Sequence, residues 1–301
     1  MGTHGLPPEV LRPGLRAFSR WALSPSLSWP TTRRRVEVAL RFPGPPRDVL
    51  ISSRSVGGVP CEVHRPPRAR SDESTTLYLH GGGWTFGSAL AWRSLAGRLA
   101  TALRQRVIVP DYRLTPDWPY DAQVADVRAV WDAVSAEAGP GATTAVGDSA
   151  GGQLALVLTL GLTAERRPLP RALGLICPAV DMTSEALAAN GPGEREPLLT
   201  PLLMQRCYAA VLNGADPRDP RFSPIYADLA GLPPIVLDTG EDDLIRRDGL
   251  RLAEAARAAG VTVDHVDHPG LWHVPHLSAP LMAGAAGLVV ERFAARLRTA
   301  A

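Results

Sequence analysis

Residues 145–152 read Ala-Val-Gly-Asp-Ser-Ala-Gly-Gly, and this stretch decides the fold. A β-rich run passes here through a Gly-x-Ser-x-Gly turn directly into an apolar helical pattern. A strand and a helix can meet so abruptly only where the flanking residues are small, as Gly147 and Gly151 are. The pattern therefore predicts a strained turn with Ser149 at its tip, beside the free amides of a helix N-terminus.

Strand and helix signals alternate on both sides of this turn. We predict strands from the β-rich runs at 49–52, 59–64, 76–79, 107–110, 144–147, 173–177, 235–238 and 261–266. Helical stretches separate most of the later runs, at 91–104, 122–137, 150–165 and 247–259. This alternation is typical of an α/β fold with a mostly parallel sheet and helices on both faces, in which ligands bind at the carboxyl ends of the strands.

Two segments lack strand character and predict a helical cap. Residues 1–45 read as short helical pieces broken by prolines, and residues 182–219 are rich in Pro, Gly and Ala around one amphipathic piece at 202–212. We therefore expect an N-terminal cap segment over 1–45 and a catalytic α/β domain over 46–301 with a cap insertion at about 182–219. Both cap segments are expected to cover the site and select substrates.

Composition narrows the class of protein. The chain has 301 residues, of which 45% are hydrophobic and 21% charged, as is usual for a soluble globular enzyme. Its net charge of +2 gives no reason to expect a nucleic-acid partner. All 32 basic side chains are arginine, which excludes a lysine Schiff base, a Walker-type phosphate lysine and a Ser-Lys dyad.

Cysteine usage and hydropathy bear on location. Cys61, Cys177 and Cys207 are too widely spaced for a disulfide framework or a paired metal motif, which favours a reducing cytoplasm. The first residues lack the apolar core of a secretory signal, and no apolar stretch reaches the ~18 residues that a membrane-spanning helix needs. We expect a cytoplasmic protein without stable membrane insertion. The oligomeric state is left open, with a homodimer among the candidates.

A second motif lies upstream, where residues 77–84 run from a strand pattern into three glycines. His80 is followed by Gly81, Gly82 and Gly83. Consecutive glycines leave backbone N–H groups unshielded, which suits a pair of donors for an oxyanion. A flexible turn is the simpler alternative, but flexibility alone rarely follows a buried strand so abruptly.

An activated serine needs a base, and four histidines lie near the last predicted strand. His265 and His268 fall in or at the end of that strand, where alternation places them on a sheet face. His273 follows a Pro-Gly turn beyond the strand, within reach of the serine turn, and His276 is its main competitor. Their spacings do not align them on a helix, so we expect no metal site and no cofactor.

The orienting acid is sought around the strand at 235–238. Asp238 ends that strand, so its side chain is expected at the sheet edge. Asp242 and Asp243 lie in the following turn, from which an acid can reach the histidine loop. Acidic residues ahead of a helix are often caps. Pattern alone therefore does not settle the choice between Asp242 and Asp243.

The motifs together resemble the bacterial branch of the hormone-sensitive lipase group, within the α/β-hydrolase superfamily. They occur in that family's order at about its spacings and span roughly residues 45–295, at 80–83, 111–116, 147–152, 223–224, 231–234 and 270–273. The stretch 111–116 is interpreted as scaffold that orders the turn beneath the glycines. The resemblance implies an α/β-hydrolase fold with a helical cap.

The resemblance also implies the roles of the site residues. Ser149 corresponds to the nucleophile and His273 to the base. The family's acid stands three residues after the position of Gly240 and about thirty before the histidine, which favours Asp243 over Asp242.

The oxyanion donors follow from the same resemblance. Gly82, Gly83 and Ala150 correspond to the donors, with Gly81 completing this loop by shaping its turn. The implied activity is a serine carboxylesterase that acts on short to medium acyl esters through an acyl-enzyme.

Other functions use the same residues. A pathway-specific serine hydrolase would hydrolyse a lactone, remove an N-acyl group or catalyse a cyclisation. A non-catalytic binding protein is disfavoured, because all three triad positions are filled. The chain departs from the family at Leu244 and Pro275, which affects the pocket wall and not the triad. The pocket is expected to involve the large side chains Trp84, Phe86, Met204, Tyr208, Leu271 and Trp272.

Overall fold

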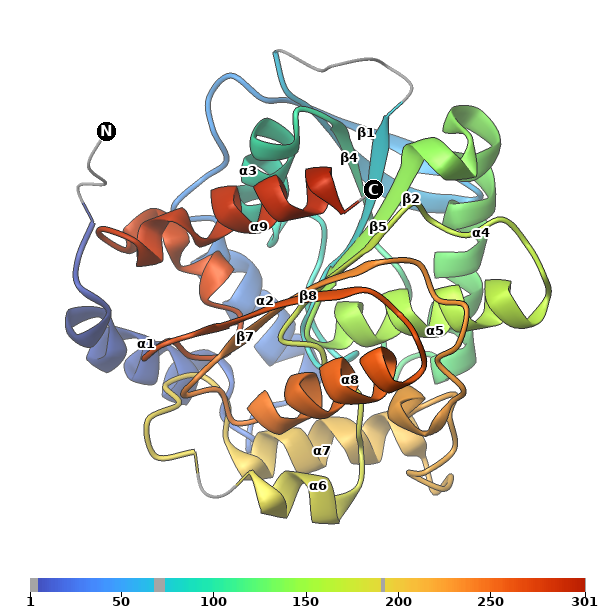
Figure 1. Cartoon of the computed structure of the whole chain (residues 1–301). Helices are drawn as coiled ribbons and strands as arrows, with labels where there is room; N and C mark the ends of the chain where they lie inside the picture. The colour runs from blue at the N-terminus through green and yellow to red at the C-terminus, as the bar shows by residue number, and fades with distance from the viewer. Residues whose placement is uncertain (1–4, 68–73, 191–192, 301) are drawn as a thin grey trace.

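The computed structural model describes residues 5–67, 74–190 and 193–300, and within them an eight-stranded sheet forms the centre (Figure 1). Its order is β1-β2-β4-β3-β5-β6-β7-β8. The pairs β1–β2 and β2–β4 are antiparallel, and all other neighbours are parallel. The strands are β1 (Leu50–Val56), β2 (Val59–Arg65), β3 (Thr75–Leu79), β4 (Arg106–Pro110), β5 (Thr143–Asp148), β6 (Leu173–Ile176), β7 (Ile235–Gly240) and β8 (Val263–His268). The predicted α/β fold is confirmed.

Helices cover both faces of the sheet (Figure 1). One face packs against α3 (Arg93–Leu103) and α9 (Val289–Thr299), and the other against α4 (Tyr120–Ala138), α5 (Ala150–Ala164) and α8 (Arg246–Ala258). In β3, Leu77 and Leu79 belong to the core on the α5 side, whereas Tyr78 belongs to the core on the α3 side. This alternation follows from the two-residue period of a strand, and burial on both faces explains why the strand carries no charged side chain.

The predicted strands all form, with small shifts at their ends. The last strand begins at Val263 rather than at 261. The placement of Asp238 at the sheet edge is wrong, because β7 continues to Gly240 and pairs with β6 on one side and β8 on the other. Asp238 is therefore fully buried inside the sheet.

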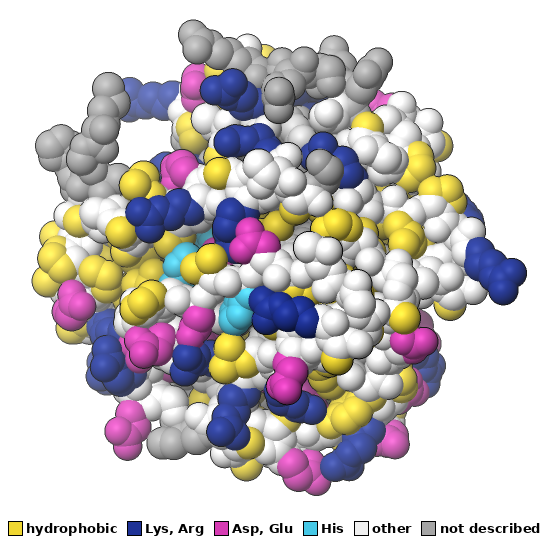
Figure 2. All heavy atoms as spheres, in the orientation of Figure 1, with side chains coloured by type: hydrophobic (Ala, Val, Ile, Leu, Met, Phe, Trp, Pro, Cys, Tyr) yellow, Lys and Arg dark blue, Asp and Glu magenta, His cyan; other side chains and the backbone are white. Residues whose placement is uncertain are grey.

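Each of the two segments predicted to form a cap contains two helices. The first holds α1 (Pro8–Ala22) and α2 (Trp29–Leu40), and the second holds α6 (Ser184–Ala189) and α7 (Pro201–Leu212). Residues 1–4 and 191–192 of these segments lie outside the described residues. Figure 2 shows hydrophobic side chains on the left flank, in the region of α1, where Val10 is exposed. The division into cap and catalytic domain stays a prediction.

Two expectations from composition also have structural counterparts. Cys61, Cys177 and Cys207 are buried and form no disulfide. None of the helices in the described ranges is long and apolar enough to cross a bilayer.

Candidate active site

Ser149 lies at the turn between β5 and α5. It has φ 51° and ψ −119°, a left-handed backbone conformation that a non-glycine residue adopts only when its surroundings enforce it. The backbone N–H of Ser149 donates to the Ile176 carbonyl at 2.8 Å, which fixes the turn against β6. The predicted strained turn is confirmed, with α5 beginning at Ala150.

The two flanking glycines allow this turn to form. A Cβ on Gly147 would lie 2.2 Å from the Gly151 carbonyl oxygen, and one on Gly151 would lie 2.0 Å from the Leu79 carbonyl oxygen. Neither position has room for a side chain, because the obstacles are backbone atoms. The motif thus reflects close approach of α5 to β5 and β3.

Asp243 and His273 form a buried hydrogen-bonded pair. His273 Nδ1 lies 2.9 Å from Asp243 Oδ2 and 3.0 Å from Oδ1. Asp243 Oδ1 also accepts from the Ile245 N–H at 2.9 Å, which holds the carboxylate within the turn after β7. Burial opposes the charged imidazole, but the charge and hydrogen bond of Asp243 raise the pKa of His273 above its ordinary value. These hydrogen bonds fix the imidazole ring through Nδ1 and leave its other nitrogen, Nε2, without a bond to Asp243.

The carboxylate of the neighbouring Asp242 interacts with arginines and not with His273. Its carboxylate pairs with Arg12 of α1 and with Arg195, the latter at 3.1 Å. Asp242 does not cap α8, because that helix begins at Arg246 and has no side-chain cap. The structure therefore brings Asp243, and not Asp242, to His273.

Asp148 organises the glycine loop from beneath. Its Oδ1 accepts from the Gly81 N–H at 2.9 Å, the Tyr78 hydroxyl at 2.5 Å and the Trp92 indole N–H at 3.0 Å. Burial raises the pKa of Asp148 to about 6 against these hydrogen bonds. Because the Gly81 amide is used in this way, Gly81 shapes the loop and does not supply an oxyanion donor. No role was predicted for Asp148, although its position between a strand and Ser149 in the sequence is a signal that could have identified it.

The other loop amides remain available. Gly82 and Gly83 have φ of 113° and 55°, and their N–H groups donate to no described residue. Ala150 is the first residue of α5, so its amide has no partner within the helix. These three N–H groups are the ones that sequence reasoning assigned to an oxyanion.

Residues 111–116 brace this loop, as predicted. The Tyr112 hydroxyl donates to the His80 carbonyl at 2.5 Å, and Thr115 donates to the Trp84 carbonyl through both its N–H and its hydroxyl. Tyr112 also stacks on the His80 ring, with centroids 4.3 Å apart. Burial lowers the pKa of His80 to about 4, so this ring is neutral and structural near pH 7.

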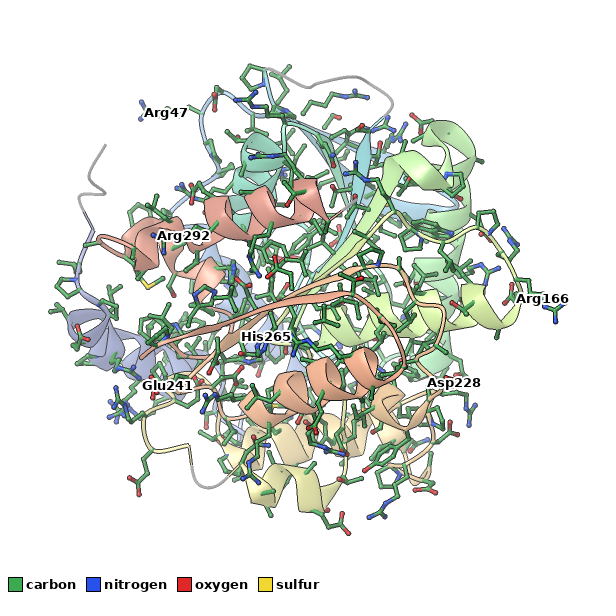
Figure 3. All side chains as sticks on the ribbon, viewed as in Figure 1. Arg47, Arg166, Asp228, Glu241, His265 and Arg292 are labelled. Atoms are coloured by element: carbon green, nitrogen blue, oxygen red, sulfur yellow. The ribbon has the colours of Figure 1, made fainter. Side chains whose placement is uncertain are left out.

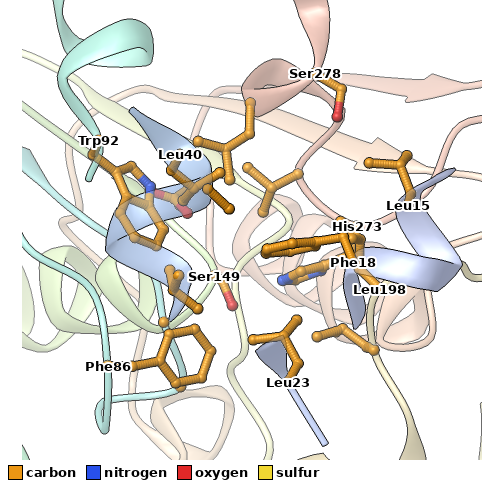
Figure 4. Close-up of a pocket in the computed structure, with 18 of the residues that line it drawn as sticks. Leu15, Phe18, Leu23, Leu40, Phe86, Trp92, Ser149, Leu198, His273 and Ser278 are labelled. Atoms are coloured by element: carbon orange, nitrogen blue, oxygen red, sulfur yellow. The ribbon is translucent and has the colours of Figure 1, made fainter. Parts of the chain in front are cut away.

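Ser149 and His273 line one cavity of about 200 Å³ (Figure 4). Neither the Ser149 hydroxyl nor His273 Nε2 is hydrogen-bonded to a described residue, so both are free to meet a bound molecule. The remaining wall is almost entirely apolar and comes from α1, α2, α7 and the loops beside them. Its members include Leu15, Phe18, Leu23, Val36, Leu40, Phe86, Leu198, Leu203, Met204 and Val274.

Comparison with known proteins agrees with this geometry. Residues 76–277 match the family described as having the alpha/beta hydrolase fold. This chain belongs to that family. The chain is similar to an acetyl-hydrolase of Streptomyces hygroscopicus, with 36% identity over 79% of this chain and 78% of the relative. A carboxylesterase, NlhH of Mycobacterium tuberculosis, is 30% identical over 97% of this chain and 98% of its own.

Comparison with solved structures identifies the branch of the family as the bacterial hormone-sensitive lipase group, which the motifs resemble. An esterase from the bacterial hormone-sensitive lipase family superposes with a TM-score of 0.89 and 31% identity, covering 97% of both chains. The expected resemblance is confirmed. Carboxylic ester hydrolysis is the activity for which these relatives are named.

The other histidines within the described residues do not line the cavity. His265 lies on β8 (Figure 3). His268 Nε2 and His276 Nε2 lie 2.7 Å and 3.1 Å from Asp238 Oδ2, and Arg296 pairs with the other carboxylate oxygen. The rival His276 is fully buried in this cluster and does not line the cavity around Ser149.

Four of the six predicted pocket residues are misplaced. Phe86 and Met204 line the cavity, but Trp84, Tyr208, Leu271 and Trp272 are absent from its described lining. The Trp84 indole N–H donates to Gln153 Oε1 at 3.0 Å in the core, where the ring contacts Tyr208. Trp272 is fully buried, and the guanidinium of Arg12 lies 5.3 Å from its ring. Side chains of α1 and α2 take their place at the cavity.

Proposed function

We propose that the chain is a serine carboxylesterase that hydrolyses small uncharged esters with short to medium acyl chains. The observation that carries this proposal is that the hydrogen-bonded Asp243–His273 pair and the strained Ser149 open onto one apolar cavity. The names of the relatives support the same reaction.

In the proposed mechanism, the Ser149 hydroxyl attacks the ester carbonyl and His273 Nε2 accepts its proton. Asp243 holds the imidazole through Nδ1 and stabilises the imidazolium as it forms. The imidazolium then protonates the departing alcohol, leaving an acyl group on Ser149. Water, deprotonated by His273, attacks this acyl-enzyme and regenerates the serine.

Backbone donors stabilise the charge that develops on the carbonyl oxygen. Gly82 and Gly83 line the cavity with Ser149, and Ala150 directly follows it, so we propose that the free amides of these three residues bind the oxyanion. Asp148 contributes indirectly, because it holds the Gly81 amide and thereby the loop.

The cavity favours a small uncharged substrate. The described lining contains no arginine, and its one basic side chain, His273, is used by the proposed reaction, so no further group there would offset a substrate carboxylate or phosphate. Its volume of about 200 Å³ is below the ~300–1,000 Å³ of pockets for drug-sized ligands. Helices α1, α2 and α7 supply much of the wall, and we propose that the two cap segments thereby select substrates.

Replacement of Ser149 by alanine tests the proposal. Hydrolysis is measured on p-nitrophenyl esters of increasing acyl length, beside a lactone and an N-acetyl amino acid. We expect the wild type to prefer the shorter esters and Ser149→Ala to lose several orders of magnitude in rate. Ser278→Ala is the matched control, since Ser278 also lines the cavity. Near wild-type hydrolysis by Ser149→Ala would refute the mechanism, and preference for the lactone or the amide would replace the substrate class.

A further inference from the structure

A second buried carboxylate lies beside His273 and has no part in the mechanism above. Glu196 belongs to the segment between α6 and α7, and its side chain reaches the histidine loop. Glu196 Oε2 accepts from the backbone N–H of His273 at 2.8 Å. Its Oε1 accepts from the N–H groups of Leu198 at 2.7 Å and Leu199 at 3.3 Å.

These contacts suit the ionised form of Glu196. All three partners are N–H donors, and a protonated carboxyl would need an acceptor for its own hydrogen. Burial and the charge of Asp243 raise the pKa of Glu196 to about 7, while His273 and the backbone donors oppose this rise. A carboxylate is kept in such a place only by its hydrogen bonds and by a neighbouring positive charge. The imidazolium of His273 supplies that charge during the reaction.

Helix α1 holds the segment that carries Glu196. The guanidinium groups of Arg12 and Arg16 donate to the carbonyls of residues 195 and 194, the latter at 2.6 Å. The Ser19 hydroxyl donates to the Leu198 carbonyl, also at 2.6 Å. The backbone on both sides of Glu196 is therefore anchored, so the carboxylate is a fixed support and not a mobile side chain.

The same segment forms part of the cavity wall. Leu198 and Leu199 line the cavity with His273, and Phe18 of α1 lies on that wall as well (Figure 4). Glu196 thus connects the groups that contact a substrate to the loop that presents the base. The contact joins residues 77 positions apart in the chain, so no local sequence pattern reveals it.

We propose that Glu196 is a positioning residue, which fixes the His273 loop to the cavity wall and adds a second negative charge that favours the imidazolium. This inference rests on the proposed function, because it concerns the base of that reaction. Asp243 orients the ring through Nδ1, and Glu196 fixes the backbone that carries the ring. The two acids act on different atoms of one residue.

Other charged groups near Glu196 and His273 also influence the pKa of His273. Asp242 and Asp243 follow β7, Arg12 and Arg16 come from α1, and Arg195 precedes Glu196 itself. Asp148 at the end of β5 also lies near enough to raise the pKa of His273. The charged groups facing this cluster are therefore Arg12, Arg16, Asp148, Arg195, Asp242, Asp243 and His273.

The test compares Glu196→Gln with Glu194→Gln across pH. Glu194 is exposed and two positions away, so it is the matched control. Glutamine removes the charge and sets an NH₂ group against N–H donors, which displaces the histidine loop. We expect kcat/KM to fall by about 10- to 100-fold, the cost of a misplacement of roughly 1 Å. The acid limb of the pH profile should move to lower pH by roughly half a unit or more, because the imidazolium loses a stabilising charge.

A third variant, Glu196→Asp, keeps the charge but shortens the reach. It should lose rate while its acid limb stays near the wild-type position, and it decides the matter if Glu196→Gln fails to fold. Unchanged rate and limb in Glu196→Gln would overturn the proposal. A slower Glu196→Gln with an unmoved limb would also overturn it, since a purely structural role gives that result.

Failure of the proposed function is recognised separately. It would appear as hydrolysis that Ser149→Ala retains. The pKa of His273, read by NMR of histidine-labelled protein, does not depend on activity. A fall of that pKa in Glu196→Gln supports the proposal, and an unchanged pKa contradicts it.

Discussion

Two buried Asp–His clusters lie close together in this chain, and they differ in what surrounds them. Asp243 is hydrogen-bonded to one histidine, His273, which lines the cavity together with Ser149. Asp238 stands five residues earlier, inside β7, and accepts hydrogen bonds from two histidines through one oxygen. The second cluster is closed by α9, from which Arg296 pairs with the remaining oxygen.

The pKa values of His273 and His276 are shifted in opposite directions. Burial lowers the pKa of His276, and the nearby Asp238 does not overcome it. Burial also acts on His273, but there Asp243 prevails and raises the pKa. One reason is that the charges of His268 and Arg296 also lower the pKa of His276, whereas Glu196 and Asp148 assist Asp243 in raising the pKa of His273.

This difference shows what makes an Asp–His pair useful as a base. Both clusters have short hydrogen bonds and deep burial. The unbonded ring nitrogen of His273, Nε2, belongs to a side chain that lines the cavity, whereas the unbonded Nδ1 of His276 is buried in a residue that does not line it. An Asp–His pair can therefore serve the proposed reaction only where its free nitrogen is accessible from a cavity, as at His273.

The largest predicted effect is the loss of turnover caused by Asp243→Asn. Asparagine keeps the shape but permits the wrong imidazole tautomer, so turnover should fall by ~10⁴, as in a comparable triad. The matched control is Asp242→Asn, which removes an ion pair with Arg12 and should change turnover by less than about tenfold. Turnover is measured in saturating ester. A large loss confined to Asp242→Asn would contradict the assignment.

The second prediction concerns the sealed cluster. Asp238→Asn should leave kcat per folded molecule nearly unchanged but lower stability by about 3–5 kcal/mol, the cost of breaking a buried ion pair. Denaturant unfolding and ester turnover measure the two effects. Asp264→Asn is the control, because it removes a more exposed partner of the same Arg296, at 3.1 Å, and should cost only ~0–1 kcal/mol. A stable but inactive Asp238→Asn variant would contradict the claim that the Asp238 cluster stabilises the fold and takes no part in the reaction.

The contrast between adjacent and distant residues also explains what sequence could predict. Hydrophobic patterns located all the strands and the Ser149 turn, because both depend on local periodicity and on small residues. Neighbouring turn residues such as Asp242 and Asp243 look alike in a pattern, since their directions depend on backbone angles. The family spacing distinguished them, and the structure brings the same residue to His273.

The residues of the cavity wall could not be predicted from local sequence patterns. Large aromatic residues near the motifs were expected to line it, yet Trp84 is buried in the core, where Gln153 accepts its N–H. Leu15 and Phe18 line the cavity instead, from a helix more than 100 residues before Ser149 in the sequence. Such packing, like the contact between Glu196 and His273, is determined only once the segments are assembled.

The smallest predicted effect is a displaced pH profile. Neutral His273 is the base, so kcat/KM should rise with pH through an apparent pKa above 6.5. The raised pKa also means that His273 contributes stability fully below 6.5 and loses it as pH rises through the folded value. His276 has the opposite sign, with its contribution complete above 6.5 and lost as pH falls.

The two opposite pH dependences can be distinguished by measuring hydrolysis rates and free energies of unfolding for His273→Gln and His276→Gln across about pH 5–9. Loss of His276 should flatten the fall in stability on acidification, and loss of His273 should remove the activity limb. An activity limb centred below 6.5 in the wild type would contradict the account of the Asp243–His273 pair.

Covalent labelling by a fluorophosphonate tests the central claim most directly, because it reports the activated serine itself. Intact-mass and peptide analysis should show one adduct per chain, located on Ser149. His276→Gln should label at nearly the wild-type rate, and His273→Gln should label slower by orders of magnitude. An adduct on another residue, or rapid labelling of Ser149 in His273→Gln together with its loss in His276→Gln, would contradict the claim that Asp243, His273 and Ser149 act together.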